Sequence, residues 1–381
     1  MTGNVQAFST AEFNARIERV RSEMASYGID VLLVHAPENI YYLTGYQTSG
    51  YFAYQTLVLT QHGDPRLLVR FLERGNVTEY SWLSEADTWK EGDDVIEKTV
   101  TLIVETAGEK VAIGIEKRSW FLTAAIAEGL AAGLPASRFL DASLLVDRVR
   151  LIKSEAEIGY LRKAGEIAEI EQRAALEALR DGVTEADVAA AVLEAGVRAG
   201  SEYTGLPHHI MSGYRYDVCH ANWGPKVVRT GELVLLELYG CVERYHATQM
   251  RTVSMGEPPD NTRRAADIVI AAQDAGLAAM KPGASAREID ALIRRPIRKI
   301  RPEYFNRTGY STGIGFPPRT AEWDALDFNE QDDWELKEGM VFHMLALAEG
   351  FGISETVLVT AASVERLTAV NPRRLQVKPC L

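Results

Sequence analysis

The chain of 381 residues is long enough for two domains, each with its own hydrophobic core. Hydrophobic residues make up 46% and charged residues 25%, as in ordinary soluble globular proteins. The formal net charge of -12 argues against a nucleic-acid partner, which requires clustered Lys and Arg. No apolar run has the length of a membrane span, and no signal peptide is recognisable, so we expect no membrane partner. The three cysteines form no C-x-x-C pair and favour a reducing compartment, so we expect a cytoplasmic protein.

The first part of the chain alternates helical and strand patterns. Apolar residues at helical spacing predict an amphipathic helix over residues 11–27, and Gly28 ends it. Three apolar runs predict strands, and an alanine-rich stretch predicts a helix: the strands cover residues 29–34, 51–60 and 108–116, and the helix covers residues 120–132. Helices that alternate with apolar strands indicate an α/β layer.

A domain boundary is indicated near residue 150. Ser154 and Glu157 have the S-x-x-E spacing of a capping box, and a long amphipathic pattern follows them. The sequence therefore predicts a first domain over residues 1–150 and a second over residues 151–381.

The second domain contains an internal repeat. Residues 178–188 and 279–289 both read as a helix end, a glycine turn, a Thr or Ser cap and a new helix. A strand entered through glycine follows each of them, at residues 231–235 and 339–343. We expect a duplicated α+β domain with two sheets around a pseudo-twofold axis, and a cleft where the strand ends meet.

Glu237 is the first candidate for chemistry. It follows the continuous apolar run from Leu233 to Leu236, which predicts a strand buried on both faces. A buried charge at that point is costly unless something binds to it. The alternative is a strand-end carboxylate that faces solvent.

Histidines gather in the second domain, which holds five of the seven: His208, His209, His220, His246 and His343. Each alone is more often structural than catalytic, but three of them lie on segments expected to converge with Glu237. Glu355 stands at the start of another apolar strand pattern, and its alternative is an exposed edge carboxylate. The loop over residues 310–318 carries two glycines that would let its backbone approach a ligand.

These motifs resemble the creatinase/aminopeptidase "pita-bread" family, which includes Xaa-Pro aminopeptidases, prolidases and creatinase. The first domain resembles the smaller N-terminal domain of the prolidase and creatinase branch, and the segment over residues 150–158 is characteristic of that branch. The resemblance implies an α+β protein: a small N-terminal α/β creatinase/prolidase-like domain followed by a C-terminal pseudo-twofold pita-bread domain.

Metallopeptidases of this family hold two metal ions with five side chains. The matching positions in this chain are Glu237, Thr248, Thr312, a position near Leu345, and Ser354, with Glu355 one place later. A divalent ion requires several oxygen or imidazole ligands, which Thr, Leu and Ser do not supply. We therefore expect no metal site and no other cofactor.

The chain resembles a metal-free branch of the family, which includes ectoine hydrolase, more closely than it resembles the metallopeptidases. This resemblance is carried by Arg244-Tyr245-His246-Ala247, by residues 309–314 with Pro317-Pro318, and by Ile353-Ser354-Glu355. The implied reaction is the metal-independent opening of a small cyclic amidine such as ectoine. An amidinium carbon is already electrophilic, so it needs no Lewis acid.

The resemblance also implies roles for the site residues. Glu237 would attack the amidine carbon as nucleophile or activate a water as base, and His220 would be the acid/base that protonates the leaving nitrogen. Glu355 is the third implied catalytic residue and would hold the ring nitrogens of the substrate. The implied substrate-binding residues are His246, His343, Tyr310 and Thr312. The alternatives are hydrolysis of another small amidine, guanidine or amide, an Xaa-Pro dipeptidase, and a non-catalytic peptide-binding member of the fold.

The branch is usually dimeric, so we expect a homodimer. The aromatic-rich segment over residues 41–54 could cover the cleft of the neighbouring subunit. The alternative for this segment is an ordinary hydrophobic core with a glycine turn.

Overall fold

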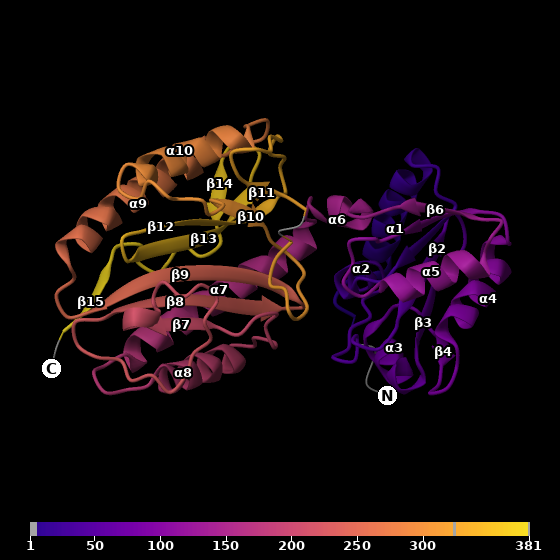
Figure 1. Cartoon of the computed structure of the whole chain (residues 1–381), viewed down its shortest axis with the longest axis horizontal. Helices are drawn as coiled ribbons and strands as arrows, with labels where there is room; N and C mark the ends of the chain where they lie inside the picture. Colours follow the sequence, from indigo (N-terminus) through magenta and orange to yellow (C-terminus); the bar gives the residue numbers. More distant parts are fainter. Residues whose placement is uncertain (1–5, 323–324, 380–381) are drawn as a thin grey trace. The chain divides into compact units, whose positions relative to one another are not determined.

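The computed structural model describes residues 6–322 and 325–379. The chain divides into two compact units, Met1–Arg150 and Leu151–Leu381 (Figure 1). Ser154 caps the first long helix of the second unit: its hydroxyl accepts from the backbone of Glu157, and the Glu157 carboxylate accepts from the backbone of Ser154. Among the described residues, no helix combines the length and the apolar character needed to cross a membrane.

A mixed sheet with the strand order β4-β3-β2-β1-β5-β6 forms the centre of the first unit. Its strands are β1 (Val31–Val34), β2 (Thr56–Thr60), β3 (Arg66–Arg70), β4 (Asp87–Trp89), β5 (Ala112–Ile115) and β6 (Arg138–Asp141). The helices are α1 (Thr10–Ser26), α2 (Pro37–Thr44), α3 (Arg74–Tyr80), α4 (Val95–Ala107), α5 (Ala124–Gly133) and α6 (Leu145–Arg150), with a short 3-10 turn η1 (Phe71–Glu73). The core joins α4 and α5 to the inner strands β1, β2 and β5.

The predicted helix over residues 11–27 is confirmed as α1, which Ser9 caps. The predicted strand over residues 51–60 is wrong in its first half, because only Thr56–Thr60 is extended. The aromatic segment over residues 41–54 is partly buried and partly exposed. Tyr41, Tyr42 and Tyr46 are buried in the core, whereas the Phe52 side chain is 79% exposed.

One continuous sheet with the order β11-β10-β12-β13-β9-β8-β7 forms the centre of the second unit. Its strands are β7 (His209–Ser212), β8 (Leu233–Val242), β9 (Tyr245–Met255), β10 (Gly309–Ser311), β11 (Asp327–Phe328), β12 (Val341–Ala348) and β13 (Phe351–Val359). Two short strands join its sides, β14 (Val364–Arg366) on β13 and β15 (Gln376–Lys378) on β9. The helices are α7 (Glu155–Ala178), α8 (Glu185–Arg198), α9 (Asp260–Ala279) and α10 (Ala286–Arg298), with a 3-10 turn η2 (Gly213–Arg215). Helices α7 and α8 cover the β7–β8–β9 part, while α9 and α10 cover β12 and β13 (Figure 1).

The predicted repeat is visible in the backbone. Gly182 and Gly283 both have positive φ, and each donates its N–H to a carbonyl of a distant strand-like segment, Val228 and Leu336 respectively. Thr184 and Ser285 cap the next helices and form matching isolated bridges. The expectation of two separate sheets is wrong in one respect, because both halves belong to one sheet.

The two halves meet where β9 lies beside β13, and side-chain hydroxyls make most of this seam. Among the described residues, β9 and β13 pair through their backbones at one position, Ser354 opposite Met250. The Thr356 hydroxyl bonds both the N–H and the carbonyl of Thr248, at 2.8 and 3.0 Å. The Ser354 hydroxyl accepts from the Met250 N–H at 2.8 Å. Short polar side chains therefore join the duplicated halves.

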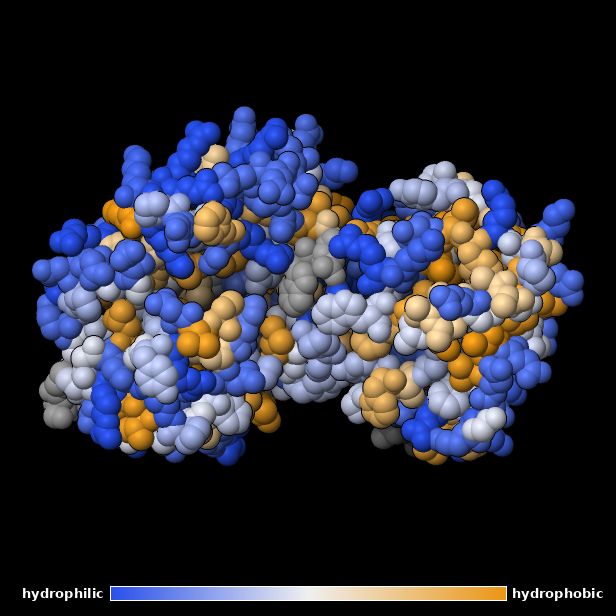
Figure 2. Space-filling model, viewed as in Figure 1, coloured by the Kyte–Doolittle hydropathy of each residue, from blue (hydrophilic) through white to orange (hydrophobic). Residues whose placement is uncertain are grey.

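Figure 2 shows a mostly hydrophilic surface on the visible face of the second unit and more hydrophobic surface on that of the first unit. The first unit contains large exposed apolar side chains, including Phe52 and Trp120, which are 79% and 58% exposed. Exposed apolar surface of this kind is often used for protein association.

Candidate active site

Two adjacent rows of side chains lie on one face of the sheet in the second unit, and together they form what we call the site face. Cross-strand partners share a face, and so do residues two apart on one strand. The first row follows the register His209, Glu237, Met250, Ser354, Leu345 across β7, β8, β9, β13 and β12. The second row contains Tyr239, Thr248, Thr356, His343 and Tyr310.

Glu237 is the carboxylate of these rows. It is half-buried on β8, and burial raises its pKa to about 7, while a hydrogen bond with the Tyr239 side chain opposes that rise. Burial also raises the pKa of the Tyr239 and Tyr310 hydroxyls, and the charge of Glu237 raises both further. The two tyrosines therefore approach Glu237 closely enough to sense its charge.

His343 and Tyr310 form a hydrogen-bonded pair on the site face. The His343 Nδ1 atom lies 2.7 Å from the Tyr310 hydroxyl, and Nε2 has no hydrogen-bond partner. Burial lowers the pKa of His343 to about 3, so this imidazole is neutral near pH 7. A neutral imidazole with a free nitrogen can donate or accept one hydrogen bond to a ligand.

His220 enters from the loop between β7 and β8. It is exposed and has a φ of 58°, and its ring centroid lies 5.7 Å from that of His209. The loop is anchored at its start, because the Tyr216 hydroxyl lies 2.9 Å from the Thr252 hydroxyl of β9. Burial and the charge of Glu237 raise the pKa of the neighbouring Cys219, which places this loop beside the carboxylate.

The structure does not bring Glu355 to the site face. It follows Ser354 on β13, so its side chain points to the opposite face of the sheet. There the buried carboxylate accepts from Arg251 Nη2 at 2.7 Å and from the Thr368 hydroxyl at 2.5 Å. Arg373 lies 3.7 Å from it. Both oxygens thus hold the C-terminal segment against the sheet.

His246 and Thr312 also lie away from Glu237. His246 pairs with Cys241, four residues along β8 from Glu237 and thus about 13 Å away. Its Nε2 accepts from the Gly205 N–H at 3.0 Å, and its Nδ1 lies 2.9 Å from the Arg244 carbonyl. The Thr312 hydroxyl donates to the His246 carbonyl at 3.2 Å. The polar groups of both side chains are used inside the protein.

The glycines of the loop over residues 310–318 pack against the protein itself. A Cβ on Gly313 would lie 2.5 Å from Glu322 Oε1, and one on Gly315 would lie 2.5 Å from the Arg319 carbonyl. These contacts explain the glycines without a ligand.

Sequence reasoning assigned no role to two polar members of the site face, His209 and Tyr239. Strand alternation from Glu237 could have identified Tyr239, which is two residues further along β8. His209 begins the four-residue strand β7 and lies directly opposite Glu237.

The donor set does not fit the two metal ions of a metallopeptidase. Glu237 is the only carboxylate in the two rows, and Met250 and Leu345, which share its row, are apolar. Among the residues that the structure describes, no group of three or more His, Cys, Asp or Glu side chains could hold a metal ion.

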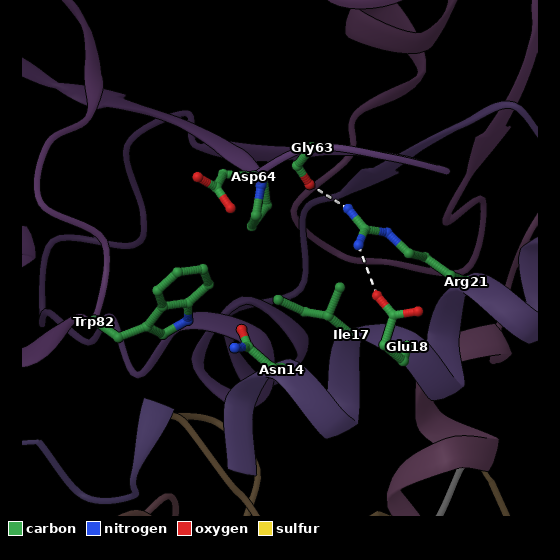
Figure 3. Close-up of a pocket in the computed structure, with 8 residues that line it drawn as sticks. Asn14, Ile17, Glu18, Arg21, Gly63, Asp64 and Trp82 are labelled. Atoms are coloured by element: carbon green, nitrogen blue, oxygen red, sulfur yellow. Dashed lines mark hydrogen bonds and ion pairs between the residues drawn. The ribbon is translucent and has the colours of Figure 1, made fainter. Parts of the chain in front are cut away.

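A separate pocket of about 330 Å³ lies in the first unit, next to α1 (Figure 3). Arg21 points along its wall and is bound to Glu18 at 2.8 Å and to the Gly63 carbonyl. The Trp82 indole N–H donates to the Leu43 carbonyl at 3.0 Å. Arg21 and Trp82 are therefore bonded within the protein.

Comparison with known proteins gives two domain matches. Residues 159–361 match the metallopeptidase family M24, and residues 16–152 match the creatinase/prolidase N-terminal domain. An uncharacterised hydrolase/peptidase of Sinorhizobium fredii is 34% identical over 97% of this chain and 98% of that protein. The ectoine hydrolase of Halomonas elongata is 28% identical over 97% of this chain and 98% of that protein. The crystal structure of a prolidase from Pyrococcus horikoshii superposes with a TM-score of 0.83 at 26% identity, covering 95% of this chain and 100% of that chain.

Proposed function

Because this chain belongs to the metallopeptidase family M24, a family of hydrolases, we propose that it hydrolyses a C–N bond of a small cyclic amidine such as ectoine without a metal ion. The site face carries the proposal, since it presents one carboxylate among neutral imidazoles and tyrosines and not a set of metal ligands. The similarity to an ectoine hydrolase over nearly the whole chain supports the same substrate class.

Electrostatics favour a cationic substrate. An amidinium ring that lies against Glu237 gains a Coulomb attraction that strengthens as water is excluded. His343 does not oppose it, because burial keeps the pKa of this imidazole near 3 and the ring uncharged. The free nitrogen of His343 and the Tyr310 hydroxyl would hold the nitrogens of the ring.

The proposed step uses two groups. Glu237 attacks the amidinium carbon directly, or takes a proton from a water that attacks it, and a new C–O bond forms. The C–N bond then breaks, and His220 gives a proton to the leaving nitrogen. If Glu237 attacks directly, a water then attacks the same carbon, breaks its bond to the Glu237 oxygen and releases the carboxylate. In both routes water supplies the oxygen and the hydrogens of the product, so no other reactant is needed. Glu355, His246 and Thr312 take no part in this scheme, because their polar groups are bonded elsewhere.

A Glu237→Gln variant tests the central assignment. The amide keeps the shape of the side chain and removes its charge, so we expect kcat/KM to fall about a thousandfold or more. The matched control is Glu303→Gln, which changes an exposed carboxylate of the second unit and should leave the rate unchanged. A Glu237→Gln enzyme within tenfold of the wild type contradicts the assignment.

A substrate panel separates the proposed activity from the main alternative. Similarity to prolidases favours an Xaa-Pro dipeptidase as the second candidate. The wild-type protein is incubated with ectoine, creatine and Xaa-Pro dipeptides, with and without a chelator. We expect turnover of the cyclic amidine in both conditions. Dipeptide hydrolysis that the chelator abolishes would replace the proposal with a metal-dependent peptidase.

A further inference from the structure

His209 is a buried polar side chain whose ring nitrogens are poorly satisfied within the protein. It is 2% exposed, and neither of its ring nitrogens makes a hydrogen bond of normal length and angle. Buried polar groups in folded proteins nearly always have a partner, and those that lack one often face a ligand. His246, by contrast, has both ring nitrogens occupied by backbone groups.

The location of His209 indicates which ligand it faces. It is the direct cross-strand neighbour of Glu237, so the two side chains leave the sheet on the same face. Its ring centroid lies 5.7 Å from that of His220 and 5.8 Å from that of Tyr239. His209 is therefore surrounded by three groups of the site described above.

The protonation state of His209 suits a cationic neighbour. Burial lowers its pKa to about 4, the charge of His220 lowers it further, and a hydrogen bond with the main chain of Ala221, outside normal length or angle, raises it. Near pH 7 the ring is neutral, so one nitrogen is an acceptor and the other is a donor. A charged imidazole would repel an amidinium, whereas a neutral one can accept one of its N–H groups.

We propose that His209 is a substrate-binding residue, whose ring nitrogen accepts an N–H group of the cationic ligand that Glu237 attracts. This role rests on the proposed function, because His209 would accept a second N–H group of the amidinium that Glu237 binds. Glu237 and His209 would then form two adjacent acceptors, one charged and one neutral. Such a pair favours a planar N–C–N cation over a simple ammonium ion, which presents its N–H groups in a tetrahedral arrangement.

The test compares His209→Phe with His209→Asn. Phenylalanine keeps the ring beside Tyr239 but removes both nitrogens, so we expect KM for ectoine to rise about tenfold to a hundredfold, the usual effect of losing a hydrogen bond to a charged group. The kcat value should change far less, because binding and not bond breaking is affected. Asparagine restores an acceptor and should recover part of the affinity.

Melting temperature distinguishes this role from a structural one. Because the His209 imidazole is poorly satisfied within the protein, its replacement with phenylalanine should leave the melting temperature equal to or above that of the wild type. The matched control is His208→Phe on the adjacent residue. His208 Nδ1 accepts from the Tyr239 N–H at 3.3 Å, so this variant should melt at a lower temperature.

The outcomes separate the two proposals. A wild-type KM in an active His209→Phe enzyme, or a fall in its melting temperature as large as that of His208→Phe, overturns the role of His209. If the wild-type protein turns over no member of the panel, the proposed function fails. The melting temperatures then still decide whether His209 is satisfied within the protein.

Discussion

The Glu237 carboxyl combines partial burial with a position between His209 and Met250 on the site face. Burial raises its pKa from the ordinary 4.5 to about 7, so the protonated and ionised forms are both populated near neutral pH. Groups poised in this way are frequent in active sites, where an acid or base must change its state during turnover.

The raised pKa predicts how activity depends on pH. Because the proposed nucleophile or base must be ionised, kcat/KM should fall about tenfold per pH unit below pH 7. A profile of kcat/KM for ectoine between pH 5 and 9 measures this. A rate that increases on acidification would contradict the assignment, because Glu237 would then act in its protonated form.

The same shift affects stability in the opposite direction. A carboxyl whose pKa is higher in the folded state favours folding while it is protonated, and this contribution is lost as the pH rises through about 7. Glu237→Gln should therefore match the melting temperature of the wild type at pH 5 and exceed it at pH 8. The difference is at most about 3 kcal/mol, and partial exposure reduces it.

The sequence predicted which residues carry polar groups on the strands more readily than the face of the sheet on which each one lies. The apolar run before Glu237 indicated a buried strand with a carboxylate on it. Ser354 and Glu355 illustrate the limit: a strand alternates its faces, so a shift of one residue moves a side chain to the other side of the sheet. His209 could not be placed, because β7 has only four residues and pairs with a strand more than twenty residues away.

Helix α7 is the element that packs most closely behind the site. It crosses β8 at Gly240, where a Cβ would lie 2.0 Å from the Ala164 carbonyl oxygen and 2.9 Å from the Ala168 nitrogen. Both are backbone atoms of α7, so they cannot move aside as a flexible side chain would. The strand that carries Glu237 is thus held in place by a glycine contact three residues away.

This contact predicts the effect of Gly240→Ala. The added methyl group must push α7 away from β8, which typically costs about 1–3 kcal/mol, so the melting temperature should fall by several degrees. The matched control is Gly159→Ala, which lies in the same helix with no atom within 4 Å of the new Cβ. It should stabilise the helix by about 0.8–1 kcal/mol. Thermal unfolding of both variants measures the effect, and equal melting temperatures would show that α7 can move freely.

Elements with two distinct faces were predictable, and those without them were not. The amphipathic α1 and the capped α7 were recognised because their apolar residues recur at helical spacing. All eight residues of α2 are buried, so this helix has no polar face, and its sequence was taken as an aromatic segment. The repeat was recognised because glycine turns and caps depend on local backbone geometry.

At the scale of the whole molecule, the association state is a separate proposal. We expect a homodimer, and the exposed Phe52 of the aromatic segment is a candidate contact. Light scattering should then give twice the chain mass of 42.1 kDa at working concentration. Phe52→Glu should shift the mass towards the monomer, whereas Phe305→Glu, a change at a 78% exposed position of the second unit, should not. A monomeric wild-type protein would contradict the proposal.

The hydroxyl seam between β9 and β13 also limits how this protein could be re-engineered. The Ser354 hydroxyl that receives the Met250 N–H occupies a position where the metal-dependent relatives are expected to carry a ligand. Replacing Ser354 with an acidic residue would remove one of the hydrogen bonds that join the duplicated halves. No bound cation would yet be present to compensate for that loss. Adding metal ligands to the proposed metal-free site would therefore require rebuilding this joint first, so we expect that single substitutions would not create a metal site.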